Sequence, residues 1–344
     1  QEILKAVISY VGAMTRVVAT TPGLYPLPDW AKEQLSELKG HQKDDLIGGD
    51  ESAEITAAYD RARSEVVDRQ QSAGLDRIVE GQLRWDDMLA HPLAVADAVE
   101  MKGIVRYYDN NNFYREPVVS DDLAATGDIA AELDAADEQV DEGLQAVLPG
   151  PYSLADLATD EHYGDDAAFL DAIADFLAEE AGQFPDVETL FLLEPSLVEN
   201  APEDGEDERA SEAIDTVANA VDADVVAHTY WGALEEKVYA HLMDAGIEAI
   251  GFDLISDHDQ NVYNVQEYGT KDDVALGLVD GQNTLVESPE TIRERIDWFD
   301  EQTDGDYGTV YATTNTETFY LPVNKFEAKL DALADAAELE EVPQ

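Results

Sequence analysis

The chain alternates short, continuously apolar segments with longer stretches whose apolar residues recur at helical spacing. A continuous apolar run is typical of a strand that is buried on both faces, and such strands, when joined by helices, form parallel sheets. Eight strands are predicted, at Arg16–Ala19, Arg77–Glu80, Leu144–Leu148, Thr189–Leu193, Asp224–His228, Glu248–Asp253, Val274–Val279 and Gly308–Ala312. Eight βα units in 344 residues predict an α/β fold, a (β/α)8 TIM barrel, and a doubly wound open sheet is the alternative.

Between these strands, apolar residues at helical spacing predict helices at Glu51–Ala73, Asp165–Ala181, Ser211–Ala220, Ala233–Ala245, Pro289–Glu301 and Lys325–Ala337. We expect one domain over residues 1–344 with an insertion at 85–141. The insertion contains a predicted hairpin, because aromatic residues alternate on both sides of the turn-forming segment Asp109–Asn112. Three charged segments, Glu199–Ser211, Asp257–Asp259 and the tail 338–344, are predicted to be solvated, and the tail to be flexible.

The charge balance is extreme, with 77 Asp and Glu against 20 Lys and Arg and a formal net charge of -57. A hydrophobic content of 44% and the regular apolar segments favour a folded chain over a disordered one. A folded protein this acidic repels itself in dilute buffer, whereas molar salt shortens the Debye length to about 3 Å. We therefore expect a cytoplasmic protein in a high-salt cytosol. Nucleic acid is not expected as a ligand, because phosphate binding needs basic patches.

The chain contains no cysteine, which excludes disulfides and thiolate metal ligands. No apolar run reaches the length of a membrane span, so no membrane partner is expected. The mildly apolar stretch Ala6–Met14 lacks a cleavage signature and is not interpreted as a signal peptide.

Polar residues stand where the predicted strands end, and in barrels the chemistry takes place at the carboxyl ends of the strands. Glu194 follows the fourth strand, His228 ends the fifth, and Asp280 follows the seventh. We therefore expect His228, Glu194 and Asp280 to be catalytic. A structural alternative exists for each, since a buried histidine is commonly a core residue and a strand-end acid commonly caps the next helix.

The order of these strand ends resembles the catalytic barrel of the cobalamin-independent methionine synthase family. The similarity extends from about Thr15 to Leu333. It implies a TIM barrel and methyl transfer to homocysteine. The segments that carry it, with the family's patterns in parentheses, are Gly23-Leu24-Tyr25-Pro26 (Gly-Ser-Phe-Pro), Gly81–Met88 (Gly-Glu-Pro-Glu-Arg-x-Asp-Met), Leu148–Pro151 (Leu-x-Gly-Pro), Leu193-Glu194-Pro195 (Asp-Glu-Pro), and Gly277–Asp280 with Val286–Glu290 (Gly-x-Val-Asp and Val-Glu-Ser-x-Glu).

The departures from the family pattern fall on the metal and substrate ligands. The resemblance places the family's zinc ligands, His, Cys, Glu and Cys, on His228, on Tyr230, near Asp253 and near Thr316. It places the residues that hold homocysteine, Ser, Glu and Asp, on Leu24, Gln82 and Leu193. It thus implies a remnant metal site at His228 and Asp253, and substrate contacts from Gln82, Arg84, Asp86 and Tyr230. Zinc is the cofactor that the family implies, but an oxygen-rich set holds it poorly. No other cofactor is implied.

Three functions remain open. The family's full-length enzymes carry two such barrels, and the N-terminal one has lost its zinc site. A separate chain of this kind is expected to act as a subunit beside a zinc-bearing catalytic barrel, with homocysteine or the methyl donor as its small-molecule ligand. The first alternative is a stand-alone methyltransferase with an altered metal site. The second is a uroporphyrinogen-decarboxylase-like barrel, which relies on arginines at the strand ends, where Arg84 is the clearest one here.

Overall fold

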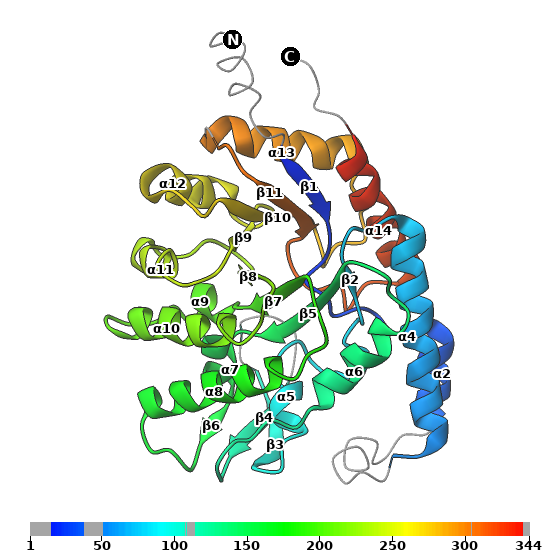
Figure 1. Ribbon diagram of the computed structural model, residues 1–344, viewed down its shortest axis with the longest axis vertical. Coiled ribbons are helices and arrows are strands. Elements are labelled where there is room, and N and C mark those ends of the chain that lie inside the picture. The colour runs from blue at the N-terminus through cyan, green and yellow to red at the C-terminus, as the bar shows by residue number, and fades with distance from the viewer. Residues whose placement is uncertain (1–14, 38–50, 107, 109–113, 304, 340–344) are drawn as a thin grey trace, which may run out of the picture.

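Eight parallel strands form one curled sheet in the computed structural model, which describes residues 15–37, 51–106, 108, 114–303 and 305–339 (Figure 1). The strand order is β1-β11-β10-β9-β8-β7-β5-β2. The bounds are β1 Arg16–Ala19, β2 Ile78–Val79, β5 Leu144–Pro149, β7 Thr189–Leu193, β8 Asp224–His228, β9 Ala249–Asp253, β10 Asp273–Val279 and β11 Thr309–Thr314. Each predicted strand overlaps one of these eight, so the predicted barrel strands are confirmed.

The two outer strands of this sheet, β1 and β2, meet and complete the ring. The backbone N–H groups of Asp76 and Arg77 donate to the carbonyl oxygen of Ala19 at 3.0 and 3.3 Å. The Asp76 carboxylate accepts a hydrogen bond from the Ala19 N–H at 2.8 Å. Because all eight strands run parallel, their carboxyl ends share one face, the barrel mouth.

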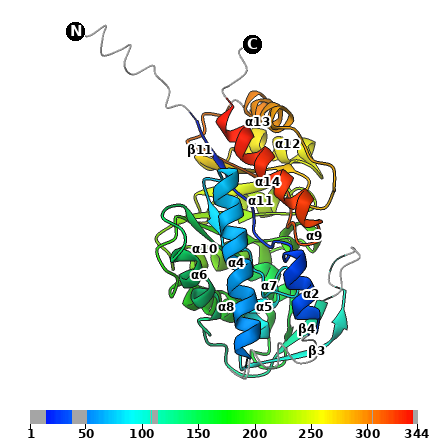
Figure 2. The same cartoon turned by 90° about the vertical axis from the view of Figure 1, so that its right-hand side faces the viewer.

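Helices surround the strands (Figure 1), and α4 and α14 run side by side along the outside of the barrel (Figure 2). The helices are α2 Asp29–Glu37, α4 Ala53–Ala73, α5 His91–Ala94, α6 Asp128–Asp137, α7 Pro151–Leu157, α8 Asp166–Ala181, α9 Ser196–Glu199, α10 Glu206–Ala218, α11 Glu236–Leu242, α12 His258–Tyr268, α13 Pro289–Thr303 and α14 Val323–Glu338. The six predicted helices correspond to α4, α8, α10, α11, α13 and α14.

Helix α4 illustrates how the sequence determines an element. The Ser52 side chain accepts a hydrogen bond from the Ile55 N–H and so begins the helix. Gly74, with a φ of 88°, ends it by donating to Gln70 O, a conformation that glycine adopts at low cost. The helix buries one apolar face, which includes Ile55 and Val66. Burying each such side chain stabilises the fold by about 2 kcal/mol.

Helices extend into two of the segments predicted to be solvated loops, so the loop prediction is wrong for the helical part of each. Helix α9 ends at Glu199, and α10 begins at Glu206, within the segment expected to be a loop. Three acids in the first turn of α10 interact favourably with the helix dipole, and the apolar face behind them is buried. Likewise, the Asp257 carboxylate accepts a hydrogen bond from the Gln260 N–H and caps α12. Residues 340–344 of the predicted flexible tail lie outside the described residues, and Glu338 belongs to α14.

The insertion after β2 contributes two strands to a small second sheet, whose third strand, β6, follows α7. Strand β3 (Val99–Val105) pairs antiparallel with β4 (Tyr114–Val119), and β4 pairs with β6 (Thr159–Asp160). The expected turn at Asp109–Asn112 and the apolar stretch Ala6–Met14 lie outside the described residues. Over the ranges that the structure describes, none of the helices combines the length and the apolar character that crossing a membrane requires.

Candidate functional site at the barrel mouth

The barrel mouth contains unusual backbone geometry. In the described part of the chain, three non-glycine residues have a positive φ: Leu24 at 57°, Gln82 at 51° and Trp231 at 64°. They follow β1, β2 and β8. A left-handed conformation at a non-glycine residue costs about 1–3 kcal/mol, and such residues cluster at functional sites. The surrounding structure therefore holds these three strand ends in place against local strain.

His228, at the end of β8, reaches across the mouth to the strand end of β11. Its Nε2 lies 3.2 Å from the carbonyl oxygen of Asn315. Two strands, β9 and β10, lie between β8 and β11, and each has a glycine beside this contact. A Cβ atom on Gly251 would lie 2.2 Å from His228 Nδ1, and one on Gly277 would lie 2.6 Å from the Cα of Asn315. The two missing side chains make room for the imidazole and for its partner.

The His228 ring is neutral at physiological pH. It is fully buried, and burial lowers the pKa of its imidazole to about 4, because the charged form loses its hydration. In the neutral ring, a hydrogen on Nε2 donates to Asn315 O, which leaves the lone pair on Nδ1. No described residue forms a hydrogen bond with this Nδ1.

Buried polar atoms without a partner gather at the ends of two strands, β8 and β11, which face each other across the mouth. Among the described residues, nine buried side-chain N and O atoms have no hydrogen-bond partner. Five of the nine belong to four residues at the ends of β8 and β11, which we call the tip cluster: His228, Tyr230, Thr313 and Glu317. Buried polar atoms are normally paired. The concentration of exceptions here indicates a place where an additional group binds.

Glu317 is the least expected member of the tip cluster. Its side chain is 1% exposed, and neither carboxylate oxygen has a hydrogen-bond partner. Burial raises its pKa to about 7, and the N–H of Glu317 itself and the side chain of Gln282 oppose the shift from outside hydrogen-bond geometry. Burial, reinforced by the charge of Glu317, also raises the pKa of Tyr230. The Tyr230 hydroxyl is thus within electrostatic range of the Glu317 carboxyl, and Asn315, two residues before Glu317, contacts His228, whose ring packs on Tyr230.

Aromatic rings continue from the tip cluster into the insertion. The rings of His228 and Tyr230 have centroids 5.4 Å apart, and those of Tyr230 and Trp231 are 5.6 Å apart. Tyr108, from the insertion, packs on Trp231 at 5.0 Å and bonds the Ser196 hydroxyl at 2.8 Å. The insertion thus supplies part of the wall of the mouth.

Asp253, expected at a remnant metal site, binds protein groups instead. Its Oδ1 accepts from the N–H groups of Ile255 and Ser256 at 2.9 Å. Its Oδ2 accepts from the Trp231 N–H at 2.8 Å and the Ser256 hydroxyl at 2.7 Å. The Asn315 amide lies 3.1 Å from both oxygens. Burial raises the pKa of this carboxyl. Asp253 thus joins the ends of β8, β9 and β11 and holds the tip cluster in place.

Glu194, expected to be catalytic, is fully buried and caps α7. Its carboxylate accepts from the N–H groups of Tyr152 and Ser153 at 3.1 and 2.8 Å and from the Ser153 hydroxyl at 2.7 Å. Gly150 makes room for it, since a Cβ there would lie 2.1 Å from the carboxyl carbon. Burial raises the pKa of Glu194 to about 7. Its observed contacts are structural, and the catalytic role stays a prediction.

The residues expected to bind substrate after β2 make other contacts. The Gln82 side chain accepts a hydrogen bond from the Leu24 N–H at 2.8 Å, which joins the ends of β1 and β2. The Arg84 guanidinium donates to Glu51 at 2.5 Å and to Glu132 at 2.9 Å. Its charge is therefore balanced by two acids beside α4 and on α6. The geometry adds no support for Arg84 as a substrate contact.

The remaining predicted residues lie at the margin of the mouth. Asp86 is exposed, and the Asp280 carboxylate accepts a hydrogen bond from the Gln282 N–H at 2.9 Å within its own loop. Of the predicted site residues, the structure brings His228 and Tyr230 into the tip cluster, with Asp253 beside them. The sequence prediction missed Glu317. The available signal was an isolated acid directly after Thr316, at the end of a strand rich in threonine.

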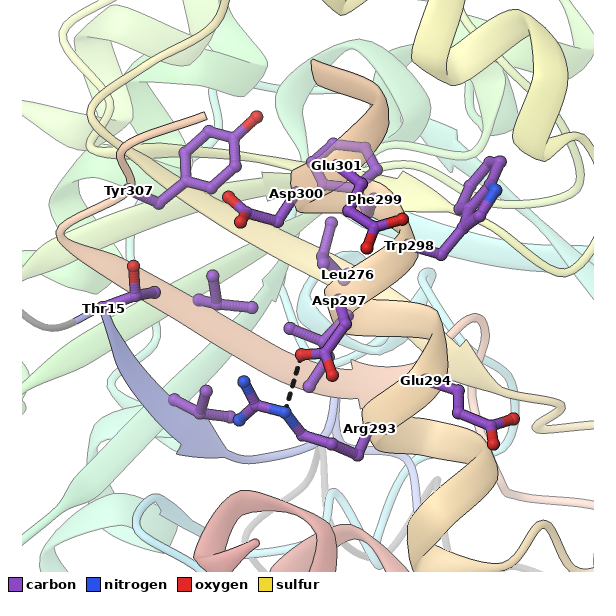
Figure 3. A pocket seen from close by; sticks show the side chains of 13 residues that line it. Thr15, Leu276, Arg293, Glu294, Asp297, Trp298, Phe299, Asp300, Glu301 and Tyr307 are labelled. Atoms are coloured by element: carbon purple, nitrogen blue, oxygen red, sulfur yellow. Dashed lines mark hydrogen bonds and ion pairs between the residues drawn. The ribbon is translucent and has the colours of Figure 1, made fainter. Parts of the chain in front are cut away.

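A large cavity of about 670 Å³ lies elsewhere, between α13 and the outer face of the sheet (Figure 3). Its lining includes Thr15 and Tyr307, which precede β1 and β11, and Arg293, whose Nε donates to Asp297 at 2.8 Å. This cavity is therefore near the amino ends of the strands, whereas barrel chemistry takes place at their carboxyl ends. We do not assign the functional site to it.

The elevated pKa values of Glu194 and Glu317 predict how stability depends on pH. Unfolded glutamate has a pKa of about 4.3, so a folded pKa of about 7 favours the protonated, folded form. The resulting stability is fully present below pH 4.3, roughly, and is lost as the pH rises through 7. We expect the midpoint of thermal unfolding at constant molar salt to fall chiefly between about pH 4.3 and 7, with on the order of 3 kcal/mol lost per carboxyl.

The matched control for this pH dependence is the double variant Glu194→Gln/Glu317→Gln, which should make the profile shallower, while the buried Glu80, whose pKa burial raises to about 8, keeps its own contribution. Calorimetry of both proteins in the same salt makes the comparison. Equal slopes for the two proteins would show that these carboxyls do not carry the effect.

Comparison with known proteins places the chain in a family. Residues 89–303, more than half of the chain, match the family model described as the cobalamin-independent synthase, N-terminal domain. The methionine synthase of Sulfurisphaera tokodaii is 22% identical over 277 residues, which cover 79% of this chain and 78% of that protein. The 5-methyltetrahydropteroyltriglutamate–homocysteine methyltransferase of Salinibacter ruber is 29% identical over 194 residues, 54% of this chain and 25% of that protein.

Solved structures show the same fold. A B12-independent methionine synthase from Shewanella sp. W3-18-1, in complex with selenomethionine, superimposes with a TM-score of 0.77 at 18% identity over 93% of this chain and 96% of that chain. A putative vitamin-B12 independent methionine synthase from Listeria monocytogenes gives a TM-score of 0.70 at 16% identity over 94% and 97%. On the family match, the chain belongs to the cobalamin-independent methionine synthase family.

Proposed function

We propose that the chain binds a small-molecule substrate at its mouth and acts as a cysteine-less subunit beside a zinc-bearing catalytic barrel, in methyl transfer to homocysteine. The observation that carries this proposal is the tip cluster. Five unpaired polar atoms gather where the resemblance places the family's metal, and no thiolate is among them, since the chain has no cysteine. The mouth is thus equipped to bind a polar ligand.

The donor set does not fit zinc. Zinc takes four ligands in a tetrahedron, with Cys and His preferred. His228 uses Nε2 on Asn315, Asp253 accepts hydrogen bonds at both oxygens, and the Thr316 hydroxyl lies 3.3 Å from a backbone carbonyl oxygen. Without a metal and its thiolates, nothing at the mouth lowers the pKa of a substrate thiol. We therefore assign thiol activation to the partner barrel.

Other groups of potential metal ligands do not change this. In the described ranges, one group of three such residues has its ligand atoms close enough to share an ion: Asp121, Asp122 and His162, all exposed. None of the three belongs to the tip cluster.

The comparisons support a role as one barrel of a two-barrel system. The matching family model is the one for the N-terminal domain. The solved relative with a TM-score of 0.77 is named as a complex with selenomethionine, an amino acid, which supports an amino acid ligand for this mouth. The high-salt cytosol inferred from the net charge of -57 is part of the same proposal.

A stand-alone methyltransferase is the second candidate. His228 offers a neutral nitrogen with a free lone pair in the same cluster as the Glu317 carboxyl, so an unusual metal or a proton transfer is chemically open there. The decarboxylase-like alternative has less support. It needs free arginines to hold substrate carboxylates, and Arg84 is already paired with two acids.

An assay of homocysteine methylation separates the two candidates. The chain, a zinc-bearing barrel of the same family, and their mixture are assayed in molar KCl with 5-methyltetrahydropteroyltriglutamate or a methylcobalamin protein as donor. We expect no turnover by the chain alone and at least about tenfold more turnover by the mixture than by the partner alone, because the chain positions substrate. Turnover by the chain alone would support the second candidate and contradict the first.

A further inference from the structure

Glu317 is an acid without a basic partner in a region where the basic side chains are already paired. Lys329 donates to the carbonyl oxygen of Leu285 at 2.5 Å and to Glu287 at 2.7 Å. The guanidinium of Arg295 donates to the carbonyl oxygen of Leu278. Among the described residues, none forms a hydrogen bond with the carboxylate oxygens of Glu317.

The ligand that completes the tip cluster must therefore supply donors. Two carboxylate oxygens of Glu317 can only accept when ionised, and the hydroxyls of Tyr230 and Thr313 can also accept. A water molecule offers two hydrogens, whereas a primary ammonium offers three in a tetrahedral arrangement. An ammonium also balances the charge of a buried carboxylate, which is costly to leave unpaired. The adjacent rings of Tyr230 and Trp231 favour a cation further through their π faces.

We propose that Glu317 and Tyr230 form the binding site for a primary ammonium group, the amino group of the substrate. This inference rests on the proposed function in one respect, namely that the substrate is an amino acid. By resemblance, the family holds homocysteine at the positions of Leu24, Gln82 and Leu193, which here provide no acid. The chain thus carries its ammonium-binding charge after β11 instead of at those strand ends.

Two partly solvent-exposed side chains lie within electrostatic range of the Glu317 carboxyl. Gln282, in the loop after β10, is exposed and approaches the Glu317 carboxyl. Tyr320, 55% exposed, has a pKa raised to about 12 by burial, to which the Glu317 charge adds. Both belong to loops at the mouth.

The test is calorimetric titration in molar KCl with two ligands: L-methionine, and 4-(methylsulfanyl)butanoate, which lacks only the amino group. The wild-type protein should bind methionine at least about tenfold more tightly than the deaminated analogue, since a charged group is worth about 1.5–3 kcal/mol in such a pair. In Glu317→Gln this preference should fall towards one, chiefly through weaker methionine binding. Tyr230→Phe should reduce the preference less, by roughly threefold.

The control variant is Glu54→Gln, which removes one acid from the exposed first turn of α4 and should keep the full preference. Circular dichroism establishes that each variant is folded. If Glu317→Gln fails to fold, the wild-type preference and Tyr230→Phe decide the question. Equal binding of the two ligands by the wild-type protein, no binding of either, or an unchanged preference in Glu317→Gln would overturn the proposal. None of these outcomes depends on the methylation assay, so failure here leaves the subunit role to be judged separately.

Discussion

Dialysis from about 3 M KCl into dilute buffer is expected to unfold the protein cooperatively. The net charge is -57, because only 20 basic residues oppose 77 acidic ones. Acidic residues also stand next to one another at sites such as the first turn of α10. At 1 M salt the Debye length is about 3 Å, and at 0.01 M it is about 30 Å, so removing salt exposes every acid to many others. The repulsion destabilises the compact state, since it is relieved when the chain expands. Far-ultraviolet circular dichroism during stepwise dilution measures the transition.

The control is a neutral osmolyte. Sucrose strengthens burial but cannot screen charge, so it should protect the fold much less than KCl of equal osmolality. A spectrum that stays unchanged in dilute buffer would contradict the high-salt adaptation that we infer from composition.

The replacement Asp253→Ala is expected to have the largest effect of any single substitution at the mouth. It leaves the N–H groups of Trp231, Ile255 and Ser256, and the Asn315 amide, without their acceptor. Asn315 is buried, Trp231 and Ile255 are half-buried and Ser256 is exposed, and each of these donors that water cannot reach costs about 1–3 kcal/mol when left unsatisfied. We expect a loss of about 4–5 kcal/mol in the free energy of unfolding, in the range of the most destabilising point mutations. Urea unfolding at constant molar KCl is the measurement.

A surface substitution provides the matched comparison. Asp134→Ala removes an exposed acid from α6 and should change the free energy of unfolding by no more than about 0.5 kcal/mol. Asp253→Asn keeps one acceptor oxygen, so its loss in the free energy of unfolding should lie between those of Asp253→Ala and Asp134→Ala. If Asp253→Ala were as stable as Asp134→Ala, the carboxylate would not be the organiser of the strand ends that its hydrogen bonds indicate.

The barrel strands could be predicted from the sequence because each is a buried apolar run, and such a run has few alternatives once helices lie on both sides of it. The prediction of secondary structure was less accurate in the charged segments, which were predicted to be loops although helices α10 and α12 begin within them. Helix α10 begins with Glu206, Asp207 and Glu208. Three consecutive acids are compatible with a solvated loop, but they also stabilise the N-terminus of a helix through its dipole. Local sequence alone does not separate these two roles, because the buried face of α10 decides between them.

The candidate site was predictable in part. His228 and Tyr230 end a buried strand, so their position at the mouth follows from the topology. Their partners do not follow from it. Asn315 meets His228 only because Gly251 and Gly277 leave space between them, and that contact depends on the curvature of the sheet. The lack of a basic partner for Glu317 likewise depends on the ion pairs of the basic side chains. Lys329 and Arg84 form ion pairs with other acids, and the spacing of residues in the sequence does not reveal these pairs.

The central claim is that the mouth of this barrel is a binding site for a polar organic ligand without a structural or catalytic zinc. The most direct test is the zinc content of the purified protein after equilibration with equimolar zinc in molar KCl, measured by mass spectrometry. The account predicts at most about 0.1 zinc per chain, the same in His228→Ala, because the four-ligand set that zinc needs is absent. One zinc per chain that disappears in His228→Ala would contradict it.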